Sequence, residues 1–287
     1  MVATRRFDAA AFSANERPVI LGHRTGEIES LVWTAKNGRV LRLSRAPWLA
    51  AGIAADGEGV IVVGREGQTL AIDDDGSRLG SVSERKVTLA LRGVTQLSTG
   101  AVVAFGLYGQ MYRRMQKTWE PWSLPPPLPK SGGKLATVRA PERNAIVGVA
   151  GDPDTTTWAF AIDGSAWSRS GKGWKASTLP VQAQWTCAAS RPGGQPVVGA
   201  PGILLVGAGA KWRSISLGEL TPVAIAALDD ALFVADGESV WRVDGKAPRL
   251  VLAEPIETLA VSKKGLVAAS ERAVFASTDG GRWAQLA

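Results

Sequence analysis

The sequence predicts an all-β fold, a single seven-bladed β-propeller built from four-stranded antiparallel blades. Three observations predict it: a recurring tryptophan, a recurring two-strand hairpin, and the lack of sustained helical periodicity. Five short phrases end in tryptophan, at Trp48, Trp119, Trp174, Trp212 and Trp283, with intervals of 71, 55, 38 and 71 residues. Each interval of 71 equals about two steps of roughly 35 residues, a period typical of propeller repeats.

The hairpin units follow one another along the chain. Each contains an apolar strand, a turn and an alternating strand. In the first unit the turn is made by Asn37 and Gly38, which favour the positive φ angles of a type I′ hairpin. The units cover residues 31–43, 60–72, 101–113, 146–174, 196–212, 232–242 and 266–275. Seven units of about 39 residues, each with room for four short strands, predict seven blades.

The whole chain, residues 1–287, is expected to form this one domain. We expect residues 1–16 to be an N-terminal extension, in which residues 8–15 could form a helical turn or two. Residues 17–21 are either the inner strand of the first blade or an outer strand added to the last. Residues 124–134 are rich in proline and glycine and predict a surface loop inserted between blades, with a docking peptide as the alternative.

Charge and compartment signals are weak. The net charge is +7, from 33 Lys and Arg against 26 Asp and Glu, and no basic run reaches five residues. This pattern predicts a solvated surface, makes a nucleic-acid partner unlikely and suits an acidic protein partner. One cysteine, Cys187, lies in an apolar strand and is expected to be buried and inert. Without a signal-like segment or a membrane-length apolar run, the expected location is the cytoplasm.

Residues suited to catalysis are scarce. The only histidine is His23, and the sequence contains no Gly-x-Ser-x-Gly nucleophile motif. Asp73, Asp74 and Asp75 resemble the start of a calcium loop but lack the downstream acid, so a hairpin turn is the favoured interpretation. We therefore expect no enzyme activity, no cofactor and no metal site.

Two phrases resemble known propeller families. Residues 277–283, Ser-Thr-Asp-Gly-Gly-Arg-Trp, resemble the Asp-box of sialidase-like and photosystem-assembly-type propellers, one residue short of its usual spacing, and residues 168–174 are a weaker echo without the Asp. In those families the box is a structural turn, so the resemblance implies fold and not activity. Residues 109–114, Gly-Gln-Met-Tyr-Arg-Arg, followed by Trp119, resemble the repeat of tectonin-type propellers.

The tryptophans divide into two predicted roles. Regular spacing predicts that the five repeat tryptophans pack between neighbouring blades, each opening an outer strand. Trp122 and Tyr108 lie beside loops or turns, and we expect them, together with Arg113 and Arg114, to form exposed contacts to a partner.

The resulting functional prediction is a non-enzymatic platform that binds a protein partner, as a monomer and without a membrane contact. A bacterial adaptor, an assembly factor or a toxin-neutralising immunity protein would fit. The alternative is a tectonin-like lectin, although the residue before each repeat tryptophan varies: Pro47, Thr118, Gly173, Lys211 and Arg282. A glycosidase or lyase is a further alternative, for which no clustered carboxylates can be assigned.

Overall fold

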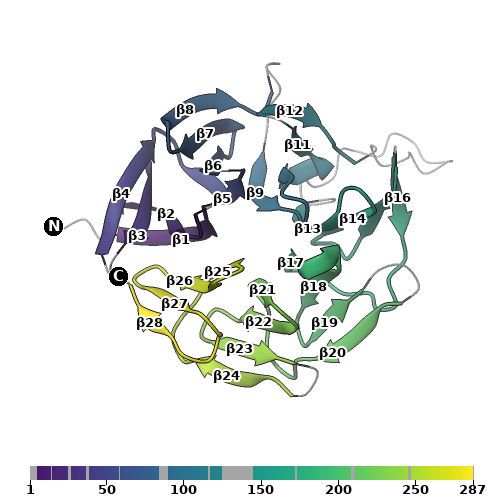
Figure 1. The fold of residues 1–287 in the computed structure, drawn as a ribbon. Coiled ribbons are helices and arrows are strands. Elements are labelled where there is room, and N and C mark those ends of the chain that lie inside the picture. Colours follow the sequence, from purple (N-terminus) through teal and green to yellow (C-terminus); the bar gives the residue numbers. More distant parts are fainter. Residues whose placement is uncertain are drawn as a thin grey trace.

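Seven four-stranded antiparallel sheets surround a central axis in the computed structural model (Figure 1). The structure describes residues 5–13, 15–24, 27–36, 39–57, 59–83, 90–115, 117–124, 145–171, 173–207, 211–244 and 247–286. Within them, regular helix is limited to two three-residue 3-10 turns, at Leu107–Gly109 and Pro192–Gly194. The predicted all-β, seven-bladed propeller is confirmed.

The strands follow one another from the axis outwards in every blade. Blades 1 and 2 contain β1 (Arg5–Phe12), β2 (Pro18–Arg24), β3 (Ser30–Lys36), β4 (Arg39–Ala46), β5 (Ala50–Asp56), β6 (Gly59–Gly64), β7 (Gln68–Asp73) and β8 (Gly76–Ser81). Blades 3 and 4 contain β9 (Leu91–Gln96), β10 (Val102–Gly106), β11 (Met111–Met115), β12 (Thr118–Pro121), β13 (Ile146–Asp152), β14 (Thr156–Ala161), β15 (Ala166–Arg169) and β16 (Trp174–Ser177). Blades 5 to 7 contain β17 (Cys187–Ser190), β18 (Pro196–Ala200), β19 (Ile203–Val206), β20 (Arg213–Ser216), β21 (Ala224–Leu228), β22 (Ala231–Ala235), β23 (Val240–Val243), β24 (Arg249–Leu252), β25 (Thr258–Ser262), β26 (Gly265–Ala269), β27 (Val274–Ser277) and β28 (Ala284–Gln285).

Side-chain size sorts the strands by distance from the axis. Inner strands crowd together and use small residues, as in β13, where a Cβ on Gly148 would lie 2.7 Å from the Cβ of Ala188 in the next blade. Second strands are covered on both faces by neighbouring blades, and every residue of β6 is buried. Their continuous apolar runs are typical of strands buried on both faces.

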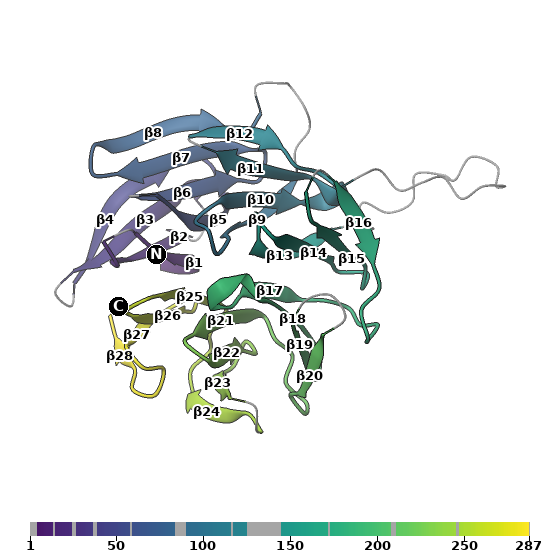
Figure 2. The same cartoon turned by 45° about the vertical axis from the view of Figure 1, so that its right-hand side comes forward.

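The ring closes without exchanging a strand between the first and last blades. β1 lies against β25 and β26, and Figure 2 shows blade 1 beside blade 7. Buried side chains join the two blades, among them Phe7 and Trp33 from the first and Val267 and Val274 from the last. One backbone hydrogen bond, from Phe7 N–H to Glu271 O at 3.3 Å, also links them. Side-chain packing therefore closes the ring.

The structure corrects three expectations about the first two blades. Residues 5–12, expected in an N-terminal extension with helical turns, form β1, the innermost strand. The segment at residues 17–21 belongs to the second strand, β2, and not to either position predicted for it. The hairpin at residues 31–43 pairs the third and fourth strands, whereas the hairpin at residues 60–72 pairs the second and third.

The repeat tryptophans pack between blades, as predicted. Trp48 contacts the cluster joining blades 1 and 2, Trp119 that of blades 2 and 3, Trp174 that of blades 3 and 4, Trp212 that of blades 4 and 5, and Trp283 that of blades 6 and 7. Trp48 follows its outer strand instead of opening it, because β4 ends at Ala46.

Two remaining expectations concern the loop and the membrane. Of the predicted proline-rich loop, residues 125–134 lie outside the described residues, and Leu124 is buried. None of the helical segments that the structure describes has the length and apolar character to cross a membrane.

Candidate functional site

The strand order creates two distinct loop-bearing faces. Since neighbouring strands are antiparallel, successive connections alternate between the two ends of the ring. We call face I the end that carries the loops between second and third strands and the loops between blades. Face II carries the turns between first and second strands and between third and fourth strands.

Exposed apolar residues gather on face I. Among the described residues, five large apolar side chains are exposed there: Ile28, Leu49, Tyr108, Ile162 and Val223. Face II exposes Met115 and Val261 among its described residues, and the remaining exposed apolar side chains, Leu41, Leu43, Leu79 and Leu250, lie on outer strands at the rim. Face I is therefore the better candidate for contact with a partner.

Tyr108 is the one aromatic side chain exposed on face I among the described residues, at 56 %. It lies in the turn between β10 and β11 with φ 56° and ψ 24°, a left-handed conformation that is rare for a bulky residue. The turn is held by hydrogen bonds from Gln110 N–H to Leu107 O and from Gly106 N–H to Gln110 O, both 3.0 Å long. Strained residues of this kind cluster at functional sites.

A hollow of about 770 Å³ lies next to this turn. It spans blades 1 to 3 and is lined by Asp8, His23, Leu49, Arg65, Arg92 and Leu107, among others. Backbone hydrogen bonds connect its wall across two blades: Leu91 N–H donates to Arg65 O at 2.8 Å, and Leu107 N–H donates to Ala90 O at 2.9 Å. The positions of Arg65, Arg92 and Tyr108 are thereby linked through the main chain.

The hollow contains an Asp-His pair. His23 Nδ1 lies 2.7 Å from Asp8 Oδ2, and His23 faces Ser30 across the β2–β3 ladder. These are the residue types of a serine-hydrolase triad. However, Ser30 is only 2 % exposed and its Oγ accepts a hydrogen bond from Ala50 N–H at 2.8 Å. Ser30 belongs to the lining of the hollow, but its near-complete burial leaves a substrate little access to its hydroxyl.

Trp122 does not occupy the exposed position expected for it, because it is only 4 % exposed. Its ring lies edge-on to Trp174, with centroids 5.0 Å apart, and its carbonyl oxygen accepts a 2.8 Å hydrogen bond from Trp174 Nε1. The guanidinium groups of Arg113 and Arg169 lie 5.3 Å and 5.2 Å from its ring centre. Burial, and then the charge of Arg113, lower the pKa of Arg169.

Arg113 and Arg114 are separated from Tyr108 by the length of β11, which runs from face I to face II. Arg113 Nε donates to Glu120 Oε1 at 2.8 Å, and Arg114 Nε donates to Asp56 Oδ2 at 2.9 Å. Both guanidinium groups therefore already have acidic partners. Of the four residues expected to bind a partner, the structure leaves Tyr108 exposed on face I. Sequence reasoning missed Arg65 and Arg92, which line one hollow where a backbone hydrogen bond joins blades 2 and 3.

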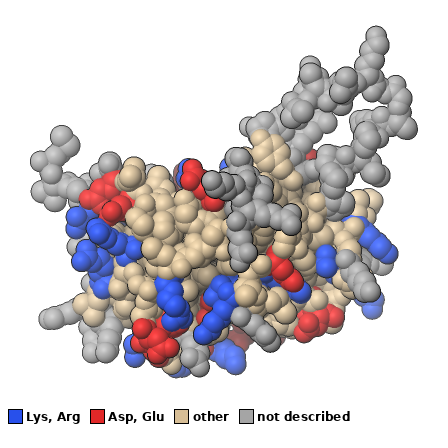
Figure 3. Space-filling view, turned by 90° about the horizontal axis from the view of Figure 1, so that it is seen from above, with Lys and Arg blue, Asp and Glu red and all other residues tan. Residues whose placement is uncertain are grey.

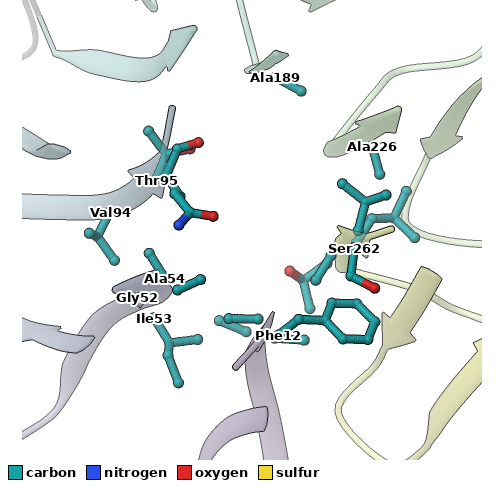
Figure 4. Close-up of a pocket in the computed structure, with 18 of the residues that line it drawn as sticks. Phe12, Gly52, Ile53, Ala54, Val94, Thr95, Ala189, Ala226 and Ser262 are labelled. Carbon is teal, nitrogen blue, oxygen red and sulfur yellow. The ribbon is translucent and has the colours of Figure 1, made fainter. Parts of the chain in front are cut away.

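A channel of about 540 Å³ lies on the axis and is lined by the inner strands of six blades. Figure 4 shows small and apolar side chains around it, including Phe12, Ile53, Val94, Ala189 and Ala226. Its ionisable lining residues, Glu16 and Lys263, belong to turns of face II. Such a lining offers little acid–base chemistry.

Charges of both signs mix over the side of the ring seen in Figure 3.

The residues Asp73 to Asp75 form the turn between β7 and β8, where Asp75 N–H donates to Asp73 Oδ1 at 3.1 Å and Arg78 pairs with Asp73. Among the residues described, no three His, Cys, Asp or Glu side chains converge as a metal site would require.

The turn that resembles an Asp-box is held by its own side chains. Asp279 Oδ1 accepts hydrogen bonds from Gly281 N–H at 2.8 Å and Arg282 N–H at 3.0 Å. Ser277 Oγ accepts one from Gly280 N–H at 2.8 Å. These backbone donors, that of Arg282 first, lower the pKa of Asp279.

We expect the stability contributed by Asp279 to depend on pH. Because its pKa is lower in the folded state, the contribution is complete above the ordinary Asp pKa of about 4 and is lost as the pH falls through the folded pKa. Thermal melting of the protein and its Asp279→Asn variant should differ at neutral pH and converge in acid. A difference in melting temperature that does not change with pH would contradict this role.

Cys187 is predicted to be unreactive while the protein is folded. It is buried, and burial raises the pKa of its thiol to about 12, so almost no thiolate forms near neutral pH. A chromogenic disulfide reagent at neutral pH should label it only after denaturant is added. Stoichiometric labelling of the native protein within the mixing time would contradict the structure.

Comparisons with known proteins identify the fold alone. No model of a known protein family matches the sequence. No curated protein matches it either. The structure resembles YCF48 from Cyanidioschyzon merolae, with a TM-score of 0.68, 15 % identity, and coverage of 96 % of this chain and 95 % of that chain. The fold is that of a seven-bladed propeller.

Three further solved structures resemble this chain. YCF48 bound to D1 peptide gives a TM-score of 0.64 at 13 % identity, covering 96 % of this chain and 93 % of that one. A catalytically inactive virginiamycin B lyase from Staphylococcus aureus, solved with quinupristin, gives a TM-score of 0.72 at 10 % identity, and the match covers 94 % of each chain. PorZ from Porphyromonas gingivalis gives a TM-score of 0.68 at 11 % identity, and the match covers 99 % of this chain but 38 % of PorZ. Identities this low carry no function across.

Proposed function

We propose that this protein is a non-enzymatic propeller that binds a protein partner through face I. The observation that carries the proposal is Tyr108, an exposed aromatic residue held in a strained, hydrogen-bonded turn. Aromatic side chains with a fixed position are the residues that most often dominate protein interfaces. The other exposed apolar residues of face I would extend the contact around this anchor.

The comparisons support a partner that is a protein. YCF48 was solved with a D1 peptide, and PorZ is described as a component of the type-IX secretion system. The packing of the repeat tryptophans between blades supports the same choice, because it removes them from the near-equivalent surface pockets that a tectonin-like lectin would need. An enzyme using the lone histidine receives no support from the shielded Ser30.

Affinity capture from the native host tests the proposal. Three baits are compared. They are the wild-type protein, a face I variant carrying Leu49→Ser and Tyr108→Ala, and a matched rim variant carrying Leu79→Ser and Leu250→Ser. All four positions are exposed leucine or tyrosine. A partner should be retained by the wild-type and rim proteins and lost by the face I variant.

Two results would overturn the proposal. One is capture of the same proteins by the face I variant as by the wild type. The other is turnover of a glycoside or ester substrate that rises in proportion to the amount of pure protein and survives His23→Ala, because the proposal assigns no catalysis to the chain.

A further inference from the structure

Two arginines in the hollow on face I have no acidic partner among the described residues. Arg65 follows β6, Arg92 lies in β9, and both are exposed and line the hollow. The ion pairs of the described residues include neither of them. The hollow therefore presents two guanidinium groups that are available to a ligand.

The acids nearby are engaged elsewhere. Asp8 pairs with His23 at 2.7 Å, and Glu66 Oε2 accepts a hydrogen bond from Gln68 Nε2 at 3.2 Å. On the same face of blade 1, Glu27 lies 3.7 Å from Arg24 and Glu29 lies 3.4 Å from Arg45. Within the described part of blades 1 to 3, these acids have partners, whereas Arg65 and Arg92 do not. The lining carries two acids, Asp8 and Glu66, and two arginines, so its formal charges balance with His23 neutral, and the groups left without an ionic partner among the described residues are the guanidiniums of Arg65 and Arg92.

We propose that this hollow binds an acidic, extended segment of the protein partner. Arg65 and Arg92 receive carboxylates of the segment, and Tyr108 packs against an apolar residue beside them. This proposal rests on the proposed function and names the chemistry of its partner. Guanidinium groups match carboxylates in planar, two-point hydrogen bonds, which gives orientation as well as attraction.

The shape and stiffness of the site favour an extended ligand. The hollow of about 770 Å³ reaches from Asp8 and His23 in blade 1 to Leu107 in blade 3, so an elongated segment can contact three blades at once. Hydrogen bonds between Arg65 O and Leu91 N–H and between Ala90 N–H and Gln110 Oε1 fix the wall that carries both arginines. A fixed site loses little entropy when a ligand binds.

Defined peptides test this inference without knowledge of the partner. The probe is a fluorescent peptide of alternating glutamate and leucine, acetylated and amidated at its ends, and binding is followed by fluorescence anisotropy. Matched glutamine–leucine and lysine–leucine peptides report the contribution of charge. The variant Arg65→Gln with Arg92→Gln removes the site, and Arg213→Gln with Arg249→Gln makes the same charge change at exposed positions on blades 5 and 6.

The glutamate peptide should bind the wild-type protein and the Arg213/Arg249 variant alike. It should bind the Arg65/Arg92 variant at least about tenfold more weakly, since a charge-assisted hydrogen bond contributes about 1.5–3 kcal/mol and each 1.4 kcal/mol is a factor of ten. The glutamine peptide should show a similar loss, and binding should weaken in salt of about 1 M, where charges are screened within about 3 Å.

Several outcomes would overturn the inference. These are no binding of the glutamate peptide, equal binding of the glutamine or lysine peptide, and full binding to the Arg65/Arg92 variant. Equal affinity for a glutamine–leucine peptide with a free C-terminal carboxylate would instead indicate capture of a chain terminus. Partner capture that depends on Tyr108 but survives the loss of both arginines would overturn this inference and leave the proposed function intact.

Discussion

Trp174→Ala is expected to lower the free energy of unfolding by about 3–5 kcal/mol, because it removes a large buried side chain from the contact between blades 3 and 4. The loss has two parts. The substitution leaves a cavity and removes the packing of the Trp174 ring against Trp122, whose ring centre lies 5.0 Å away. The carbonyl oxygen of Trp122 also loses its 2.8 Å hydrogen bond from the indole. Equilibrium denaturation followed by circular dichroism measures the change.

Two further variants separate these parts. Trp174→Phe keeps an aromatic ring but removes the indole N–H, so it should destabilise less than Trp174→Ala. Leu79→Ala, at a position on β8 that is 65 % exposed, should alter stability by no more than about 0.5 kcal/mol. If Trp174→Ala changes the free energy of unfolding as little as Leu79→Ala does, the Trp174 side chain does not stabilise the contact between blades 3 and 4.

Tyr108→Gly is expected to separate stability from binding. Glycine adopts positive φ without the steric cost of roughly 1–2 kcal/mol that a side chain incurs there, although it loses more entropy on folding. Stability should therefore stay the same or rise by up to about 1 kcal/mol. Partner binding should weaken by about 2 kcal/mol or more, roughly thirtyfold, if Tyr108 is an interface anchor.

Tyr108→Ala and Tyr108→Phe complete this test. Alanine keeps the strained backbone and removes the ring, so it should lose binding without gaining stability. Phenylalanine keeps the ring and should retain most of the binding. Titration calorimetry with the captured partner, alongside thermal melting, gives both quantities. A glycine variant that binds as tightly as the wild type would remove Tyr108 from the interface, and one that unfolds more easily would show that the turn is not strained.

The predictable part of this protein is the part that depends on neighbouring residues in the chain. Turn residues and alternating strands act over a few residues, and tryptophans recur along the chain. Together these signals predicted seven blades and the packing role of Trp48, Trp119, Trp174, Trp212 and Trp283. Tyr108 belongs to the same class, since Gly109 follows it directly in a tight turn. The burial of Cys187 was also predicted correctly from its apolar strand.

The first blade shows where local reasoning fails. Ala9, Ala10 and Ala11 favour a helix in isolation. They form a strand here because residues 5–12 pair with residues 18–24 and pack against the last blade, which lies more than two hundred residues away in the chain. A contact at that separation leaves no periodic signal in the segment itself.

For the candidate site too, the sequence determined some features and the tertiary structure decided the others. The sequence by itself determined the propeller, the repeat packing and an aromatic residue at a turn. Only the folded ring decided that Trp122 is buried, because Trp174 and Arg169 reach it from the next blade. The ring also placed Arg65 and Arg92 in one hollow, where a backbone hydrogen bond from Leu91 N–H to Arg65 O joins blades 2 and 3. Contacts between blades depend on packing geometry between residues far apart in the chain, and no local sequence pattern predicts that geometry.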